Sequence, residues 1–256
     1  MPFARRARCR LYYEVTGDPL LPALVLVRGL ARSSRYWGAL IPHLARFHVV
    51  LVDNRGVGRS DAPWPPYSSR QLADDVAAVM DAAGIDRAHV FGMSLGGMIV
   101  QQLALAHAAR IDRLVIGCST PGGRRAHRAS IRALLQLRDA RDVDRQLAIL
   151  VSEATPELRE HWLAIARDEP ARWRGVLGQV AAGLRHDVYD RLGDITHPTL
   201  VITGDDDVII PPANSRLLAE RIPNATLVVL AGARHDFTSD RPVESARAIT
   251  EFLEAR

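Results

Sequence analysis

The chain has 256 residues, of which 48% are hydrophobic and 24% are charged, a composition typical of a globular protein built around one core. Its formal net charge is +4, and its basic side chains are all arginines, scattered along the chain instead of gathered on one face. This dispersed charge argues against a nucleic-acid-binding protein. The two cysteines, Cys9 and Cys118, lie far apart in or beside apolar runs, so we expect buried thiols and no disulfide framework.

The N-terminal residues carry positive charge with no apolar stretch behind them, a pattern that does not fit a secretory signal. No window of the sequence has the apolar length that a membrane-spanning helix needs. We therefore expect a cytoplasmic protein with no membrane partner. The choice between monomer and dimer stays open.

Short apolar runs alternate with helical patterns along most of the chain. The runs predict strands at residues 11–15, 23–27, 49–52, 90–91, 114–116, 199–203 and 226–230. The periodic segments predict helices at residues 37–44, 69–83, 97–107, 213–221 and 242–254. Ser68 with Gln71 forms a capping-box pattern at the start of the second helix, and Gly84 is a stop signal at its end. Because continuous apolar strands suit burial on both faces, the sequence predicts an α/β fold with a mostly parallel, helix-flanked central sheet.

Residues 121–192 differ from the rest of the chain. They are rich in Arg, Ala and Leu, lack β-branched runs, and read as helices separated by Gly123, Pro156 and Pro170. A helical insertion before the penultimate strand predicts a cap, or lid, over the carboxyl edge of the sheet, where ligands bind in open α/β folds. The predicted core is then formed by residues 1–120 and 193–256.

The segment Gly92-Met93-Ser94-Leu95-Gly96 follows a strand-like run and opens a helix-like one. The pattern Gly-x-Ser-x-Gly in this setting predicts a nucleophile elbow, in which a sharp turn holds the serine hydroxyl clear of the sheet. Small residues are needed at both glycine positions because a larger side chain would clash across the turn. Ser94 is therefore the candidate nucleophile.

A serine hydroxyl needs a base to take its proton. Of the nine histidines, only His235 directly follows a predicted strand at its carboxyl end, so His235 is the candidate base. The strand at residues 199–203 ends in Gly204-Asp205-Asp206-Asp207 at the same edge of the sheet. The chain order serine, acid, histidine is the one expected for this architecture, but physical reasoning leaves the choice among the three aspartates open.

Taken together, these motifs resemble the α/β-hydrolase superfamily over nearly the whole chain. Within it the sequence is most similar to small capped esterases, including enol-lactone hydrolases, the perhydrolase and haloperoxidase group, and methylesterases of anthracycline biosynthesis. The matching segments are residues 26–30, 53–60, 92–96, 198–207 and 232–235.

The resemblance implies that Asp207 is the catalytic acid. It also implies an oxyanion hole formed by the backbone N–H groups of Leu30 and Leu95, the second of which lies at a helix N-terminus. Arg28 occupies the position where most relatives carry histidine. Arg28 could hold the oxyanion loop by hydrogen bonds, bind a substrate carboxylate or phenolate, or accompany a distorted oxyanion hole. Gly29 and Trp37 are further candidates for substrate contact, although Trp37 could equally pack the first helix on the sheet.

The sequence thus predicts a serine hydrolase that cleaves a carboxylic ester or lactone of a small to medium organic molecule through an acyl-enzyme. The same triad could instead support perhydrolysis, C–C bond hydrolysis or a lyase or cyclase reaction. A non-catalytic ligand-binding protein is disfavoured because all three triad residue types occur at fitting positions. We expect no cofactor and no metal, since no His, Cys or Asp cluster has metal-ligand spacing.

Overall fold

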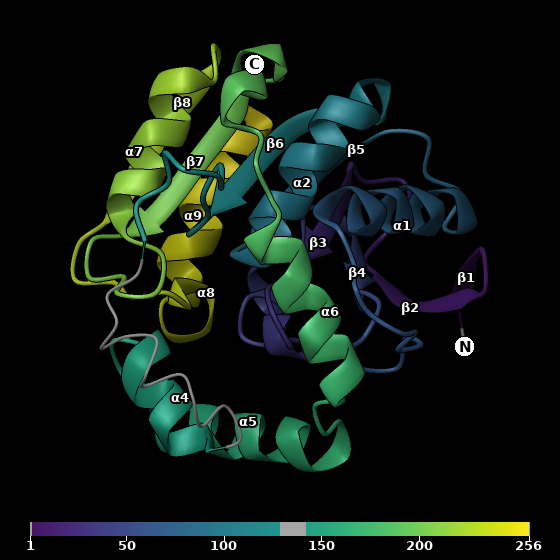
Figure 1. The fold of residues 1–256 in the computed structure, drawn as a ribbon. Helices are drawn as coiled ribbons and strands as arrows, with labels where there is room; N and C mark the ends of the chain where they lie inside the picture. The colour runs from purple at the N-terminus through teal and green to yellow at the C-terminus, as the bar shows by residue number, and fades with distance from the viewer. Residues whose placement is uncertain (1, 129–141, 256) are drawn as a thin grey trace.

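The computed structural model describes residues 2–128 and 142–255 (Figure 1). Its centre is an eight-stranded sheet with the order β1-β2-β4-β3-β5-β6-β7-β8. The strand β2 runs antiparallel to both of its neighbours, and the strands from β4 to β8 pair in parallel. The strands are β1 (Phe3–Arg6), β2 (Cys9–Thr16), β3 (Ala23–Val27), β4 (His48–Val52), β5 (Ala88–Met93), β6 (Ile111–Gly117), β7 (Thr199–Gly204) and β8 (Ala225–Leu230).

Helices cover both faces of the sheet. On one face, α1 (Ser69–Ala82), α2 (Leu95–Ala106) and α7 (Pro212–Arg221) bury their apolar stripes against the strands. On the other face, α8 (Phe237–Asp240), α9 (Pro242–Glu254) and the segment between β3 and β4 form a second core. Successive residues of β3 alternate between the two cores, with Leu24 and Leu26 in one and Val25 and Val27 in the other. The predicted mostly parallel, helix-flanked sheet is confirmed.

Most predicted elements are present, with two differences. The strand β1 was not predicted, because its run Phe3–Arg6 ends in two arginines and shows no apolar alternation. The helix predicted at residues 37–44 is wrong: the chain forms the short 3-10 turns η1 (Ser34–Trp37) and η2 (Ile41–His43), with Pro42 at the start of the second. A third turn, η3 (Ala108–Arg110), leads into β6.

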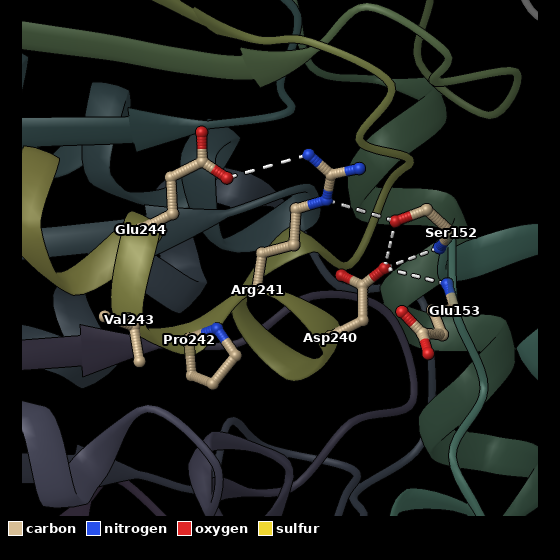
Figure 2. Close-up of a pocket in the computed structure, with 7 residues that line it drawn as sticks. All are labelled: Ser152, Glu153, Asp240, Arg241, Pro242, Val243 and Glu244. Carbon is tan, nitrogen blue, oxygen red and sulfur yellow. Dashed lines mark hydrogen bonds and ion pairs between the residues drawn. The ribbon is translucent and has the colours of Figure 1, made fainter.

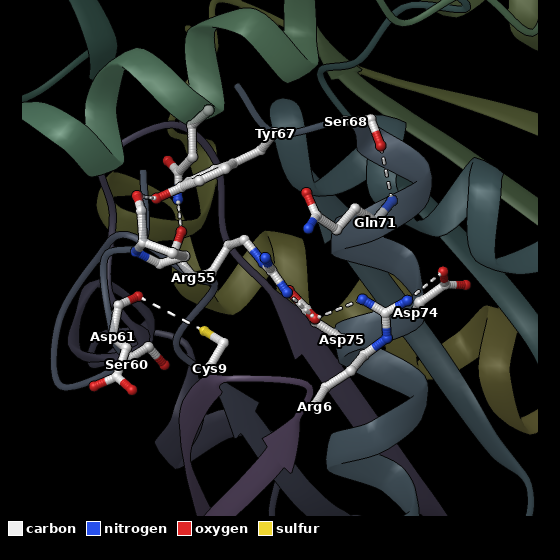
Figure 3. Close-up of polar contacts among 12 residues, drawn as sticks. Arg6, Cys9, Arg55, Ser60, Asp61, Tyr67, Ser68, Gln71, Asp74 and Asp75 are labelled. Carbon is white, nitrogen blue, oxygen red and sulfur yellow. Dashed lines mark hydrogen bonds and ion pairs between the residues drawn. The ribbon is translucent and has the colours of Figure 1, made fainter. Parts of the chain in front are cut away.

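The predicted ends of α1 are confirmed. The Ser68 side chain accepts a hydrogen bond from the Gln71 N–H at 3.1 Å, and Gly84 adopts a positive φ of 71° just beyond the helix. Inside the helix, Asp75 is buried and pairs with Arg55, with Nε–Oδ2 and Nη2–Oδ1 distances of 2.5 Å (Figure 3). This ion pair joins α1 to the loop that follows β4.

Within residues 121–192, the described part contains helices and no strand. These helices are α4 (Val143–Leu150), α5 (Pro156–Asp168), α6 (Trp173–Leu184) and the 3-10 turn η5 (Tyr189–Asp194). Two of the predicted separators bound α5, since Pro156 is its first residue and Pro170 follows its end. Figure 1 shows α4 and α5 beyond one end of the sheet and α6 crossing back toward the core. The role of this segment as a lid stays a prediction.

No helix in the described ranges has both the length and the apolar character that crossing a bilayer requires.

Candidate active site

Ser94 lies on the turn that joins β5 to α2. Its backbone has φ 58° and ψ −120°, a strained combination for a residue other than glycine. The turn depends on its two glycines: a Cβ at Gly92 would lie 2.2 Å from the carbonyl oxygen of Gly96, and a Cβ at Gly96 would lie 2.0 Å from that of Val27. The Ser94 hydroxyl does not cap α2, so the helix does not occupy it. The local geometry is that of a nucleophile elbow.

His235 and Asp207 form a buried pair at the same edge of the sheet. The Nδ1 atom of His235 lies 2.7 Å from Oδ2 of Asp207. The other carboxylate oxygen of Asp207 accepts the backbone N–H groups of Ile209 and Ile210, at 2.8 and 3.0 Å. A carboxylate on Nδ1 favours the tautomer whose Nε2 can accept a proton, which is the form that a general base requires.

Neither neighbouring aspartate is hydrogen-bonded to the histidine within the described ranges. Asp205 accepts the backbone N–H of Gly232 at 2.6 Å, and Asp206 faces Arg234 at 3.4 Å. Of the three aspartates, Asp207 is therefore the one in hydrogen-bond contact with His235, and its role as the catalytic acid stays a prediction.

The loop after β3 approaches Ser94 closely. A Cβ at Gly29 would lie 2.9 Å from the Cβ of Ser94, so glycine is needed there to let the loop approach. Across from it, Leu95 opens α2, and its N–H therefore has no partner within the helix. The amides of Leu30 and Leu95 thus belong to the two segments that meet at Ser94.

A helix of the 121–192 segment holds this loop from the other side. The Gln179 side chain, fully buried in α6, accepts the N–H of Ala31 at 2.8 Å and donates to the carbonyl of Arg55 at 3.0 Å. Ala31 has a positive φ of 56°, so its contact stabilises a strained part of the loop. Sequence reasoning missed Gln179, because a lone glutamine in a helical segment carries no local signal.

Arg28 is 2% exposed and is paired within the protein. Its Nη2 lies 2.6 Å from Oδ2 of Asp236, and its Nη1 lies 3.2 Å from Oδ1 of Asp236 and 3.0 Å from Oγ1 of Thr238. Burial alone would raise the pKa of Asp236, but the charge and hydrogen bonds of Arg28 outweigh burial and lower it. Asp236 thus occupies the position on Arg28 that a substrate carboxylate would take. Of the three roles considered for Arg28, the structure favours holding the oxyanion loop.

Trp37 is completely buried. Its ring packs on Phe91 with centroids 5.0 Å apart, and the Arg28 guanidinium lies 4.5 Å above it. The structure therefore favours packing over substrate contact for Trp37. The sequence allows packing of Trp37 on the sheet to be predicted, but it does not predict the contact with the Arg28 guanidinium.

The fold brings together three side chains that sequence spacing did not group. Single donor atoms of Cys118, Asp207 and His235 lie within 4.8 Å of one another. Burial raises the pKa of the Cys118 thiol well above its ordinary value, with the Asp207 charge as a second cause. A thiol in this state stays protonated, and the role of the His235–Asp207 pair in a triad stays a prediction.

Residues that follow His235 form hydrogen bonds with the end of α4 and with the residues just after it. The N–H of Asp236 donates to the carbonyl of Leu150 at 2.6 Å. Farther along, one carboxylate oxygen of Asp240 accepts the backbone N–H of Ser152 at 2.5 Å, that of Glu153 at 3.2 Å, and the Ser152 hydroxyl (Figure 2). A cavity of about 490 Å³ opens beside this junction and is lined by Ser152, Glu153 and residues 240–244. None of the predicted site residues lines it, so this cavity is separate from Ser94.

Comparison with known proteins identifies the family of the chain. The family model described as "alpha/beta hydrolase fold" matches residues 22–137 and 132–242. The protein named "Putative carbamate hydrolase RutD" from Caulobacter vibrioides is 35% identical, and the match covers 95% of each chain.

Two solved structures are similar over almost their full length. A hydrolase from Pseudomonas aeruginosa PA01 is 30% identical with a TM-score of 0.86, and the match covers 99% of this chain and 98% of the other. The enol-lactonase from Burkholderia xenovorans LB400 is 28% identical with a TM-score of 0.85, and the match covers 99% and 100%. With the sheet order and the elbow turn, these matches show that the chain is a hydrolase and belongs to the α/β-hydrolase family.

Proposed function

We propose that this protein is a serine hydrolase that cleaves a carboxylic ester or lactone of a small to medium organic molecule through an acyl-enzyme. The observation that carries the proposal is the buried hydrogen bond between His235 and Asp207, at the sheet edge that also bears the Ser94 turn. An imidazole held by a buried carboxylate, at the same sheet edge as a half-buried serine, is the arrangement that activates a hydroxyl for attack on a carbonyl.

In the first half of the reaction, the Ser94 oxygen attacks the substrate carbonyl carbon while Nε2 of His235 takes the hydroxyl proton. The carbonyl oxygen becomes an oxyanion that accepts the N–H groups of Leu30 and Leu95. As the bond to the leaving alkoxide breaks, His235 returns the proton to the departing oxygen. An ester linkage between Ser94 and the acyl group remains.

In the second half, His235 removes a proton from water, and the resulting hydroxide attacks the acyl carbon. The bond to Ser94 breaks, and its oxygen recovers a proton from His235. Asp207 keeps its negative charge throughout and stabilises the imidazolium in both halves. Residues 121–192 act as a lid that shields the acyl-enzyme and shapes the substrate pocket.

A carbamate is the second candidate substrate. It is favoured by the 35% identity to a protein named for carbamate hydrolysis. Its carbonyl can be attacked by the same serine, with an amine or alkoxide as the leaving group. Fold similarity does not choose between the two substrate classes, because substrate identity depends on the pocket.

The test is a turnover panel of p-nitrophenyl esters, lactones and aryl carbamates matched in acyl size. We expect the wild type to hydrolyse members of the panel and Ser94→Ala to lose about a thousandfold or more in kcat. Faster turnover of carbamates than of matched esters would select the second candidate. Activity that persists in Ser94→Ala would contradict the nucleophile assignment, and perhydrolysis without hydrolysis would contradict the reaction class.

A further inference from the structure

Arg32 lies two residues beyond Leu30, and its guanidinium is held between two aromatic rings. Its Cζ atom lies 4.1 Å from the ring centroid of Tyr36 and 4.2 Å from that of Trp162. Tyr36 belongs to η1 of the core, whereas Trp162 belongs to α5 of the 121–192 segment. The half-buried cation is therefore held between two rings where α5 meets the core.

No carboxylate of the described residues forms an ion pair with this guanidinium. Its Nη2 donates to the neutral side-chain oxygen of Gln146 at 2.7 Å, and its Nη1 is buried with no hydrogen-bond partner among those residues. Burial lowers the pKa of Arg32, and attraction by Tyr36 and Asp236 offsets only part of that effect. Asp236 itself is already engaged by Arg28 at 2.6 Å.

An uncompensated charge in this position is energetically costly. Arginine does not lose its proton in proteins, so Arg32 stays cationic and its desolvation must be balanced by other groups. The two aromatic faces return only part of the free energy that removing this charge from water costs, because they carry no net charge. The Nη1 atom of this charged group has no hydrogen-bond partner among the described residues, so it can donate to an anionic ligand.

The surroundings of Arg32 place that ligand next to the proposed catalytic groups. The Arg32 N–H donates to the carbonyl of Gly29 at 3.3 Å, and Gly29 lies against Ser94. On the other side, Asp236 directly follows His235 and is one of the charges that act on Arg32. Arg32 is thus joined by one backbone hydrogen bond to the residue that lies against Ser94.

We propose that Arg32 binds a carboxylate group of the substrate, so that the protein prefers monoanionic substrates over their neutral counterparts. The proposal rests on the proposed function, because it assigns the distal group of the molecule that Ser94 attacks. A carboxylate matches the planar guanidinium and its single unbalanced charge, whereas a phosphate dianion would need further donors.

The experiment compares p-nitrophenyl hemiglutarate with p-nitrophenyl pentanoate, which have acyl chains of equal length with and without the terminal carboxylate. In the wild type we expect kcat/KM to be higher for the hemiglutarate. Arg32→Met should lower the ratio of the two values by about tenfold or more, the worth of a charge-assisted hydrogen bond. Arg32→Lys, which keeps the charge but loses the planar fork, should fall between them.

The matched control is Arg35→Met. Arg35 lies three residues farther along the chain, in η1, but its guanidinium already pairs with Asp168 at 3.1 Å. We expect this variant to keep the wild-type ratio. An equal ratio in the wild type and in folded Arg32→Met would overturn the proposal, as would an equal fall of the ratio in Arg35→Met.

A binding measurement separates this proposal from the proposed function. Glutarate should raise the Tm of Ser94→Ala protein, which cannot turn over substrate, and neutral glutaramide should not. Stabilisation by glutarate without Ser94-dependent turnover would reject the proposed function and keep the anion site. Turnover that depends on Ser94, with no difference between glutarate and glutaramide, would reject the anion site alone, even if Arg32→Met failed to fold.

Discussion

Arg28 connects three parts of the site through one side chain. Its guanidinium pairs with Asp236 after the proposed base, contacts Met93 before the proposed nucleophile, and lies over Trp37 beneath the loop. A neutral histidine, usual at this position, would not supply the charge that Asp236 needs. Arg28, which stands where the related sequences have histidine, therefore has its own counter-ion in Asp236.

Replacing Arg28 by Met should destabilise the protein by about 3–5 kcal/mol, because Asp236 would stay buried without its cation. The double variant Arg28→Met with Asp236→Asn removes both charges and should recover most of that loss. Urea unfolding of the single and double variants measures both effects. A single variant as stable as the wild type would show that the pair contributes nothing.

At the scale of elements, α6 packs directly on the loops that surround Ser94. A Cβ at Gly175 would lie 2.0 Å from the carbonyl oxygen of Gly56, so the helix backbone touches the loop after β4. One turn farther along, Gln179 holds Ala31 of the loop after β3. The position of α6 and the shape of the proposed oxyanion hole are thereby coupled.

Gln179→Ala should lower kcat by about ten- to a hundredfold with little change in KM, since the loss of one buried hydrogen bond costs about 1–3 kcal/mol and loosens the loop that carries the proposed oxyanion donor Leu30. Gln179→Glu keeps the acceptor for Ala31 and should recover part of the rate. Gln101→Ala is the control, because that buried glutamine bonds to Gly97 and Thr120. Equal losses of kcat in both alanine variants would contradict the claim that Gln179 positions the loop after β3 for catalysis.

At the scale of the whole molecule, His186 makes stability depend on pH. It is 1% exposed where the end of α6 meets the start of α1, with Nδ1 3.0 Å from Oγ of Ser69. Burial lowers its pKa from 6.5 to about 4, so the unfolded chain binds a proton at pH values where the folded chain does not.

The free energy of unfolding should therefore fall as pH decreases from 6.5 to 4, by about 3 kcal/mol from this residue. His186→Gln removes the titrating group and should flatten this part of the curve. Urea unfolding of both proteins at several pH values within that window measures the difference. Parallel curves for the wild type and the variant would contradict the assignment.

Local patterns were sufficient to predict most of the fold. Apolar runs located the buried strands of the parallel sheet, and the Ser68 and Gly84 signals located the ends of α1, because these features depend on neighbouring residues. The segment at residues 37–44 was mistaken for a helix because its apolar spacing resembles a helical face, although Gly38 and Pro42 interrupt it.

Prediction of the site was limited by contacts between distant residues. Ser94 directly follows β5 and His235 lies in the loop after β8, and the topology of a parallel sheet brings such positions to one edge. The partners Asp236 for Arg28, Gln179 for Ala31 and Trp162 for Arg32 come from loops and helices far along the chain. Contacts between such distant residues produce no periodic pattern in a single sequence. The choice among the possible roles of Arg28 therefore depends on its contact with Asp236 in the structure.

The central claim is that Ser94 is the nucleophile of a serine hydrolase, and the most direct measurement is the site of covalent modification by a fluorophosphonate. We expect peptide mass spectrometry to find one phosphonyl group on the peptide that contains Ser94 and none on Ser94→Ala protein. His235→Gln should react far more slowly than the wild type, because the hydroxyl loses its base. A wild-type protein that stays unlabelled, or a label that persists in Ser94→Ala, would contradict the account.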